Sequence, residues 1–250
     1  MNTKVKEIFQ FLHNDNDLVV GMDLPFFNPS KKKEKDTDCW CHADQDIRLK
    51  EGGGHPSHQG ILYVWDSTQH NSSNTILWPK SWDSEYHKLI KCVPSNVRDG
   101  HGLYVDKVTD NKVKKDLMDG WVANARRIQV PKGSLLIFNS RTIHQGYPCG
   151  YRLAQTISWE PRKYRNDDAL HRKLQAIHRQ IGTTHWASLG IHHGASFVRS
   201  RKENYSTDHM ECVFPMKTIH PVPAKEILPW KNSSSDEMMN ALHNEYKDCI

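Results

Sequence analysis

The chain has 250 residues, 37% hydrophobic and 25% charged, which is typical of a globular protein with a substantial core. No stretch approaches the roughly 20 apolar residues of a membrane-spanning helix, and the N-terminus lacks the apolar core of a signal peptide. We therefore expect an intracellular, cytoplasmic protein whose six cysteines are reduced. The net charge of +5 neither supports nor excludes a nucleic-acid partner.

The expected elements begin with a helix and then become strands. Residues 3–13 carry apolar side chains at helical spacing, and residues 17–30 have the pattern of a strand followed by a turn. Further strands are expected within 59–67, 74–79 and 101–108, and three more between 126 and 162. Short strands separated by Gly, Pro and Asn turns predict a mainly β fold, an antiparallel sandwich or barrel with flanking helices.

The pattern changes after Pro161. An amphipathic helix is expected over 166–182, with Asn166 or Asp167 as its N-cap and Gly182 as its C-cap. The following region is rich in His, Pro and Trp and ends in a second helix, over 233–248. Because no linker is visible, we expect one domain, 1–250, with a β core at about 16–162 and a helical and irregular extension at about 163–250.

One histidine–acid pair has a distinctive position. In a chain with 16 histidines, several His-x-Asp/Glu pairs are expected by chance. The chain has four such pairs: His13/Asp15, His42/Asp44, His209/Glu211 and His243/Glu245. Only the His42/Asp44 pair immediately precedes the β-rich region. Residues i and i+2 of a strand point to the same side, so both side chains could reach one metal ion inside a barrel.

The best candidate for a third ligand is His144, which follows the apolar segment "GSLLIFN". A hairpin through "QGYPCGY" is expected to bring His144 and Arg152 onto neighbouring antiparallel strands. Two histidines and one carboxylate form the ligand set of non-haem Fe(II) oxygenases, with positions left open on the metal. A buried arginine could bind the far end of a dicarboxylate co-substrate with two hydrogen bonds.

Three segments carry a family resemblance: "WCHADQ", "QGILYVWDSTQHNSSNTILWPKSW" and "KGSLLIFNSRTIHQGYPCGYRLAQTISWEP". In this order they resemble the phytanoyl-CoA dioxygenase-like branch of the Fe(II)/2-oxoglutarate-dependent oxygenases, over about residues 16–162. The resemblance implies a double-stranded β-helix, also called a jelly roll or cupin-like fold. It further implies functional residues, with iron bound by His42, Asp44 and His144 and 2-oxoglutarate bound by Arg152 and Gln59.

The resemblance also implies an activity. The expected enzyme hydroxylates an unactivated C–H bond of a small-molecule or lipid-derived substrate, while 2-oxoglutarate and O2 are converted to succinate and CO2. A protein side chain or a nucleobase remains an alternative substrate. Thr156 and Ser158 share a strand face with Arg152 and could line the pocket.

Other interpretations stay open. The first is a structural zinc site, whose ligands would come from Cys39, Cys41, His42 and Cys149, although the spacing is unusual for one. The second is a non-catalytic jelly-roll module that binds a metal or ligand. The histidines at 185, 192 and 193 could lie at the active-site mouth or in an exposed irregular segment. The oligomeric state is left open.

Overall fold

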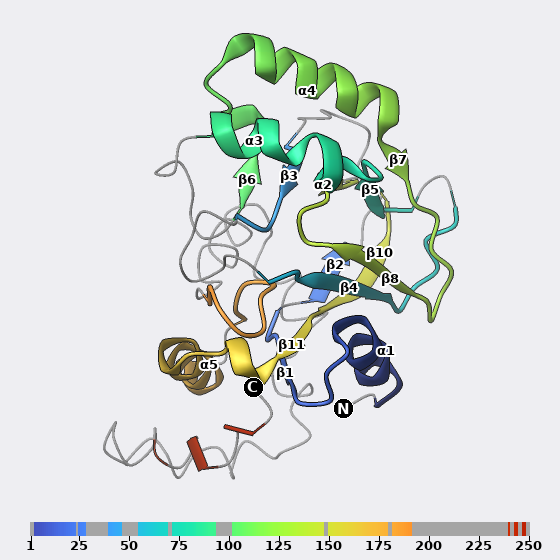
Figure 1. Ribbon diagram of the computed structural model, residues 1–250. Coiled ribbons are helices and arrows are strands. Elements are labelled where there is room, and N and C mark those ends of the chain that lie inside the picture. Colours follow the sequence, from blue (N-terminus) through green and yellow to red (C-terminus); the bar gives the residue numbers. More distant parts are fainter. Residues whose placement is uncertain are drawn as a thin grey trace.

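Short strands, most of them in two antiparallel sheets, form the centre of the molecule (Figure 1). The computed structural model describes residues 3–23, 25–28, 40–46, 55–69, 72–93, 102–147, 150–179, 182–191, 240, 243–244 and 247–248. The strands are β1 (Leu18–Val20), β2 (Pro25–Asn28), β3 (His42–Ala43), β4 (His58–Tyr63), β5 (Thr75–Leu77), β6 (Leu103–Tyr104), β7 (Arg126–Arg127), β8 (Leu135–Asn139), β9 (His144–Gly146), β10 (Arg152–Ile157) and β11 (Trp159–Pro161). The helices are α1 (Thr3–His13), α2 (Ser81–Ser84), α3 (Tyr86–Cys92), α4 (Asn111–Asn124) and α5 (Asp167–Arg179), with 3-10 turns η1 (Val105–Lys107) and η2 (Arg162–Tyr164).

The strand order defines the fold. One sheet has four strands in the order β2-β10-β4-β8, and the other has five in the order β6-β3-β9-β5-β7. From β7 to β10 the chain passes from one sheet to the other with each successive strand, and every pairing within these sheets is antiparallel. This alternation is the topology of a double-stranded β-helix, so the expected jelly-roll fold is confirmed.

The sequence alternates along the strands as two facing sheets require. In β10, Arg152, Ala154 and Thr156 are buried, whereas the residues between them are only partly buried. The buried set faces the five-stranded sheet, because Arg152 donates a hydrogen bond to Thr75 of β5 at 3.3 Å. Polar side chains therefore lie between the two sheets, beside an apolar cluster that includes Ile61, Tyr63 and Phe138.

The helices cover the outer faces of the sheets. In Figure 1, α2, α3 and α4 lie together on the side of the five-stranded sheet. A large apolar cluster fills this layer: Cys41, Ala43, Trp78, Tyr86, Leu89, Ile90, Val93, Leu103, Val105, Val108, Leu117, Trp121 and Ile143. Helix α1 packs through Val5 and Phe9 against β1, β11 and the outer face of the four-stranded sheet. None of the helices in the described ranges is both long and apolar enough to cross a membrane.

Local signals explain where two helices begin. Helix α4 starts after Asp110, whose carboxylate accepts hydrogen bonds from the backbone N–H groups of Lys112 and Val113. Helix α5 begins after Asn166, whose side chain accepts from Ala169 N at 2.8 Å, so of the two expected N-cap candidates, Asn166 and Asp167, the N-cap is Asn166. Helix α5 is described to Arg179, and residues 180 and 181 are outside the described ranges, so the expected C-cap at Gly182 stays a prediction. Most of the expected second C-terminal helix is also outside these ranges, although Asn240, His243 and Asn244 are helical.

The structure departs from the sequence-based expectation in its helices, in the number of late strands and in one strand pairing. Five strands, β7 to β11, lie between residues 126 and 162, where three were expected. Helices α2, α3 and α4 were not expected. The expected hairpin that would place His144 and Arg152 on neighbouring strands is wrong. His144 lies on β9, which pairs with β3 and β5, and Arg152 lies on β10, which pairs with β2 and β4. The chain crosses between sheets here, so the two side chains face each other across the interior.

Candidate metal centre

Two neighbouring strands hold the two histidines of the candidate site. His42 of β3 is the direct antiparallel partner of His144 of β9, and their ring centroids are 4.5 Å apart. Asp44 follows β3 directly, and the backbone N–H groups of Asp44 and Gln45 both donate to Ser140 O at 3.0 Å. Strand pairing and this loop anchor therefore bring the three residues together, as the sequence predicted.

The potential ligand atoms converge on one point. Asp44 Oδ1 lies 3.2 Å from His42 Nε2, and Asp44 Oδ2 lies 3.1 Å from His144 Nε2. One ligand atom from each residue lies within 4.8 Å of the other two, and all three residues are buried. This is the only such group of His, Cys, Asp and Glu in the described part of the chain.

The hydrogen bonds of the rings determine which nitrogen faces the carboxylate. His42 Nδ1 is 3.1 Å from Trp40 O, and His144 Nδ1 is 2.9 Å from Thr142 O. A carbonyl oxygen can only accept, so each Nδ1 carries a proton, and in the neutral ring Nε2 carries a lone pair. Two lone pairs and a carboxylate therefore meet in a buried space. Such a group of acceptors requires a positive charge, either a metal ion or protons on the imidazoles.

Neighbouring side chains fix the orientation of each ligand. The His42 ring lies between Trp40 and Tyr104, with centroid distances of 5.0 Å to both and interplanar angles of 20° and 18°. The Gln59 side-chain amide donates to Asp44 Oδ2. Gln59 thus holds the carboxylate from the opposite sheet, and it is the residue for which the family resemblance implies a co-substrate contact.

Arg152 lies across the interior from the histidines. The residue is buried, and its guanidinium lies over the rings of Phe26 and Tyr63 at 4.5 and 5.1 Å. Thr75 accepts its hydrogen bond and is also 3.0 Å from the Tyr63 hydroxyl. Arg152 therefore has two hydroxyl groups beside it, and that of Thr75 was not identified from the sequence.

Gly146 connects the arginine side to the histidine side. It is on the same strand face as His144, and a Cβ added there would lie 3.6 Å from the Trp40 ring and 3.8 Å from Arg152 Nη1. Trp40, His144 and Arg152 thus border one region between the sheets.

Charges around the site favour a neutral imidazole and an ionised carboxylate. Burial lowers the pKa of His42, and the nearby Asp44 charge opposes this only in part. For Asp44, burial acts to raise the pKa, but the imidazoles of His144 and His42 outweigh it and hold the pKa well below its usual range. A neutral imidazole and an ionised carboxylate are the forms that bind metal.

Other expected residues fall in different places. His185 forms an ion pair with Asp23; burial opposes its protonation, but the carboxylates of Asp23 and Asp44 raise its pKa to about 9. This histidine therefore lies near the site, whereas residues 192 and 193 are outside the described ranges.

Cys41 packs in the apolar cluster on the opposite face of the β3 segment from His42, and the other two cysteines of the zinc hypothesis are outside the described ranges. Thr156 is buried on the Arg152 face, and Ser158 donates to His58 O.

The fold and the site together define a jelly-roll protein with a buried group of two histidines and one carboxylate that could hold a divalent metal ion. No family model and no curated protein matches the chain. Two solved structures of EctD from S. alaskensis are similar. The form with 2-oxoglutarate and 5-hydroxyectoine gives a TM-score of 0.41 at 11% identity, covering 66% of this chain and 52% of that chain. The apo form gives 0.32 at 9% identity, covering 60% and 45%.

The chain therefore spans about half the length of the solved structures that it matches. At these identities and TM-scores the likeness to EctD does not establish a family. The interpretation of the site depends on its own residues.

Proposed function

We propose that this protein is an Fe(II)- and 2-oxoglutarate-dependent dioxygenase that hydroxylates an unactivated C–H bond of a small-molecule or lipid-derived substrate. The observation that carries the proposal is the convergence of His42 Nε2, His144 Nε2 and the Asp44 carboxylate in a buried space. Two imidazoles and one carboxylate are the ligand set of non-haem Fe(II) oxygenases, which leaves metal positions open. The phytanoyl-CoA dioxygenase-like branch is the family that we propose.

The bound metal and co-substrate would supply the oxidising power for hydroxylation, with 2-oxoglutarate and O2 consumed and succinate and CO2 released. The protein would contribute orientation. His42, Asp44 and His144 would hold the ion, and the carbonyls of Trp40 and Thr142 would keep both Nε2 atoms directed toward it. Gln59 would fix the carboxylate through its bond to Asp44; a direct contact between Gln59 and the co-substrate remains a prediction.

Arg152 would bind the far carboxylate of 2-oxoglutarate. Its guanidinium is buried, faces the histidine side of the interior and has the fork geometry that matches a carboxylate. The hydroxyls of Thr75 and Tyr63 lie close enough to orient the guanidinium and add hydrogen bonds to the same carboxylate. Thr156 stays a candidate for the pocket wall. A protein side chain or a nucleobase is the alternative substrate.

The test is the visible charge-transfer absorption that Fe(II) and 2-oxoglutarate produce together under anaerobic conditions. The wild-type protein should show the band, and Asp44→Ala should not. Arg152→Met should require about 10- to 100-fold more 2-oxoglutarate, because it loses charge-assisted hydrogen bonds. The exposed Arg126 supplies the matched control, since Arg126→Met should leave the titration unchanged.

A second oxoacid distinguishes the role of Arg152 from the role of the metal ligands. 2-Oxobutyrate lacks the far carboxylate, so Arg152→Met should not change its apparent affinity. Equal weakening with both oxoacids would show that Arg152 supports the fold rather than the carboxylate. No band with folded wild-type protein would contradict the dioxygenase proposal and return attention to a non-catalytic binding module.

A further inference from the structure

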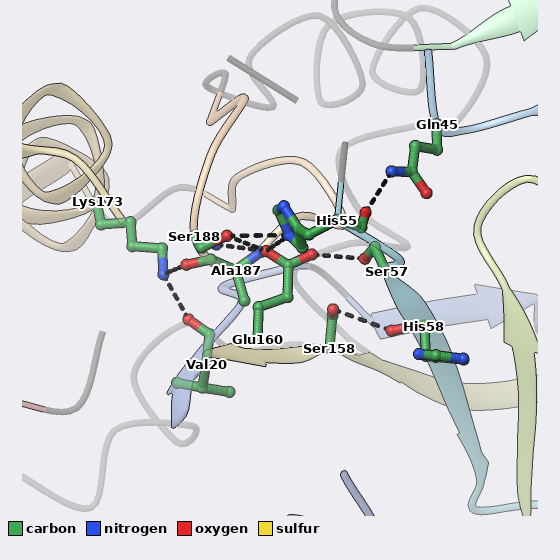
Figure 2. A network of polar contacts seen from close by, with 10 residues as sticks. All are labelled: Val20, Gln45, His55, Ser57, His58, Ser158, Glu160, Lys173, Ala187 and Ser188. Carbon is green, nitrogen blue, oxygen red and sulfur yellow. Dashed lines mark hydrogen bonds and ion pairs between the residues drawn. The ribbon is translucent and has the colours of Figure 1, made fainter. Parts of the chain in front are cut away.

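A second buried polar cluster surrounds Glu160 of β11, which has no exposed surface (Figure 2). Glu160 Oε1 accepts a hydrogen bond from Ser57 Oγ at 2.5 Å. Glu160 Oε2 accepts from Ser188 N at 2.7 Å, from Ser188 Oγ at 2.5 Å and from Ala187 N at 3.2 Å. The two oxygens of one carboxylate therefore bind two segments that are far apart in the sequence.

His55 completes the cluster on the Oε2 side. Its Nε2 lies 3.7 Å from Glu160 Oε2, and its ring stacks on Tyr164 with a centroid distance of 4.2 Å. Burial acts to raise the pKa of the Glu160 carboxyl, but the hydrogen bond and charge of His55, with the serine hydrogen bonds, lower it to about 2. The carboxylate is thus ionised and supplied with donors on both oxygens.

Residues 55–59, which contact Glu160 through Ser57 and His55, also contact the metal-binding loop, residues 42–46. Gln45 Nε2 donates to His55 O at 2.7 Å. Ser140 N donates to Ser57 O at 3.0 Å, and Ser140 O is the acceptor that anchors the backbone of residues 44 and 45. Gln59, two residues after Ser57, donates to Asp44 itself. Residues 55–59 therefore support the metal-binding loop directly and through Ser140.

The Oε2 side holds the docked segment, residues 182–191. Lys173 of α5, which has no exposed surface, donates to Ala187 O and, at 2.7 Å, to Val20 O. Thr183 N donates to Met22 O at 2.8 Å. The same segment carries His185, which forms an ion pair with Asp23. His185 is near enough to Asp44 for the charge of that carboxylate to raise the pKa of His185. The docked segment therefore lies beside the metal centre.

We propose that Glu160 is a positioning residue for the metal centre: one oxygen holds residues 55–59 against the metal-binding loop, and the other docks residues 182–191 beside it. This inference rests on the proposed metal site at His42, Asp44 and His144. Because one carboxylate holds both segments, metal binding and docking are linked, and each stabilises the other by the same free energy. The substitution Glu160→Gln should therefore weaken both.

The two oxygens of Glu160 accept hydrogen bonds from different serines, so three variants can test each oxygen alone and both together. Ser57→Ala removes the partner of Oε1, and Ser188→Ala removes the side-chain partner of Oε2. Glu160→Gln affects both sides. Glu85→Gln is the matched acid control, since Glu85 is only partly buried and pairs with the half-exposed Lys88 at 2.8 Å. Leu170→Ala is the control for general destabilisation, because Leu170 is buried in α5 and its apolar side chain takes no part in the hydrogen bonds of the cluster.

The experiment uses the full chain with Co(II) as the metal probe. Co(II) affinity comes from its visible absorption, and docking comes from hydrogen exchange of peptides covering residues 182–191, with and without Co(II). Ser57→Ala should weaken Co(II) binding about 10-fold, which is typical of residues that orient ligands. Ser188→Ala should speed exchange of the segment and, through the linkage, weaken Co(II) binding by less than Ser57→Ala does. In Glu160→Gln, Co(II) binding should weaken at least 10-fold and Co(II) should no longer slow the exchange.

Each result bears on a distinct claim. Wild-type protein that binds no Co(II) would contradict the proposed metal site. Wild-type protein that binds Co(II), with Ser57→Ala and Glu160→Gln unchanged in affinity, would overturn the positioning role of Glu160 alone. Leu170→Ala should lower stability without changing Co(II) affinity, and a change there equal to that of Ser57→Ala would also overturn it. If Glu160→Gln does not fold, the two serine variants decide the question.

Discussion

The candidate metal centre has a buried carboxylate beside two histidines, and the Glu160 cluster has a buried carboxylate beside one. The hydrogen bonds of the two carboxylates differ. Around Glu160, backbone N–H groups and two serine hydroxyls point at the carboxylate. Around Asp44, two imidazole nitrogens whose partner nitrogens already donate elsewhere face the carboxylate. The Glu160 carboxylate has protein donors on both oxygens, whereas the Asp44 carboxylate accepts from Gln59 and also faces two imidazole lone pairs. That difference, rather than residue type or burial, distinguishes a ligand site from a structural ion cluster.

The largest expected difference is in metal affinity. His144→Ala should weaken Co(II) binding by more than about 100-fold, since losing a ligand exceeds the 10- to 100-fold effect of losing a residue that orients one. His55→Ala should weaken it far less, because His55 contacts the metal-binding loop only through its backbone carbonyl. Titration of the two variants with Co(II) measures both values. Equal losses would contradict the distinction between the clusters.

The second difference is in the pH dependence of stability without metal. The pKa of Glu160 falls from about 4.5 in the unfolded chain to about 2 in the folded protein, so its contribution is full above pH 4.5 and is lost as pH falls toward 2. Imidazole and ammonium groups near it come from four elements or segments: His13, His55, His58 and Lys173. Glu160→Gln should cost about 3 kcal/mol at neutral pH.

Urea unfolding between pH 2 and 7 tests this expectation. The stability difference between wild-type protein and Glu160→Gln should shrink as the pH falls, because both then carry an uncharged group at position 160. Glu85→Gln is the control and should show a smaller difference, as its ion-pair partner Lys88 is half exposed to solvent. A difference that stays constant down to pH 2 would mean that packing, not charge, accounts for the loss.

The smallest expected effect has the opposite sign. At pH 8 and without metal, Asp44→Asn should stabilise the fold by about 1 kcal/mol, because an amide can donate a hydrogen bond to one of the two Nε2 lone pairs. As the pH falls and His42 becomes protonated, the gain should disappear, since the imidazolium pairs with the wild-type carboxylate. Urea unfolding of both proteins with a chelator present measures the difference. Destabilisation at pH 8 would indicate that Asp44 is already satisfied by protein donors.

Much of the metal cluster was predictable from the sequence. The His42/Asp44 spacing places both side chains on one side of a strand, and the apolar strand before His144 marked the next candidate. The sheet membership of His144 and Arg152 was not predictable, because a short turn between strands is typical both of a hairpin and of a crossing between sheets. The crossing became clear only from the pairing of β9 and β10.

Helix α4 and the Glu160 cluster were not predicted, for different reasons. Helix α4 carries local signals that are sufficient to predict it, with Asp110 as N-cap and apolar residues at 113, 117 and 121. Its glycine, Gly120, lies against the Trp78 ring so closely that a Cβ would clash, which a sequence alone does not reveal. Glu160 also carried no signal, since its partners at 55–57 and 187–188 are far away in the chain.

The complete burial of Lys173 has a consequence for chemical reactivity. An amine held between two carbonyls and without access to solvent cannot be acylated until it is released. Lys112, whose side chain is 86% exposed, reacts freely and serves as an internal standard. The rate of acylation at Lys173 relative to Lys112 therefore measures how often α5 and the docked segment separate. The native chain needs no added label for this measurement.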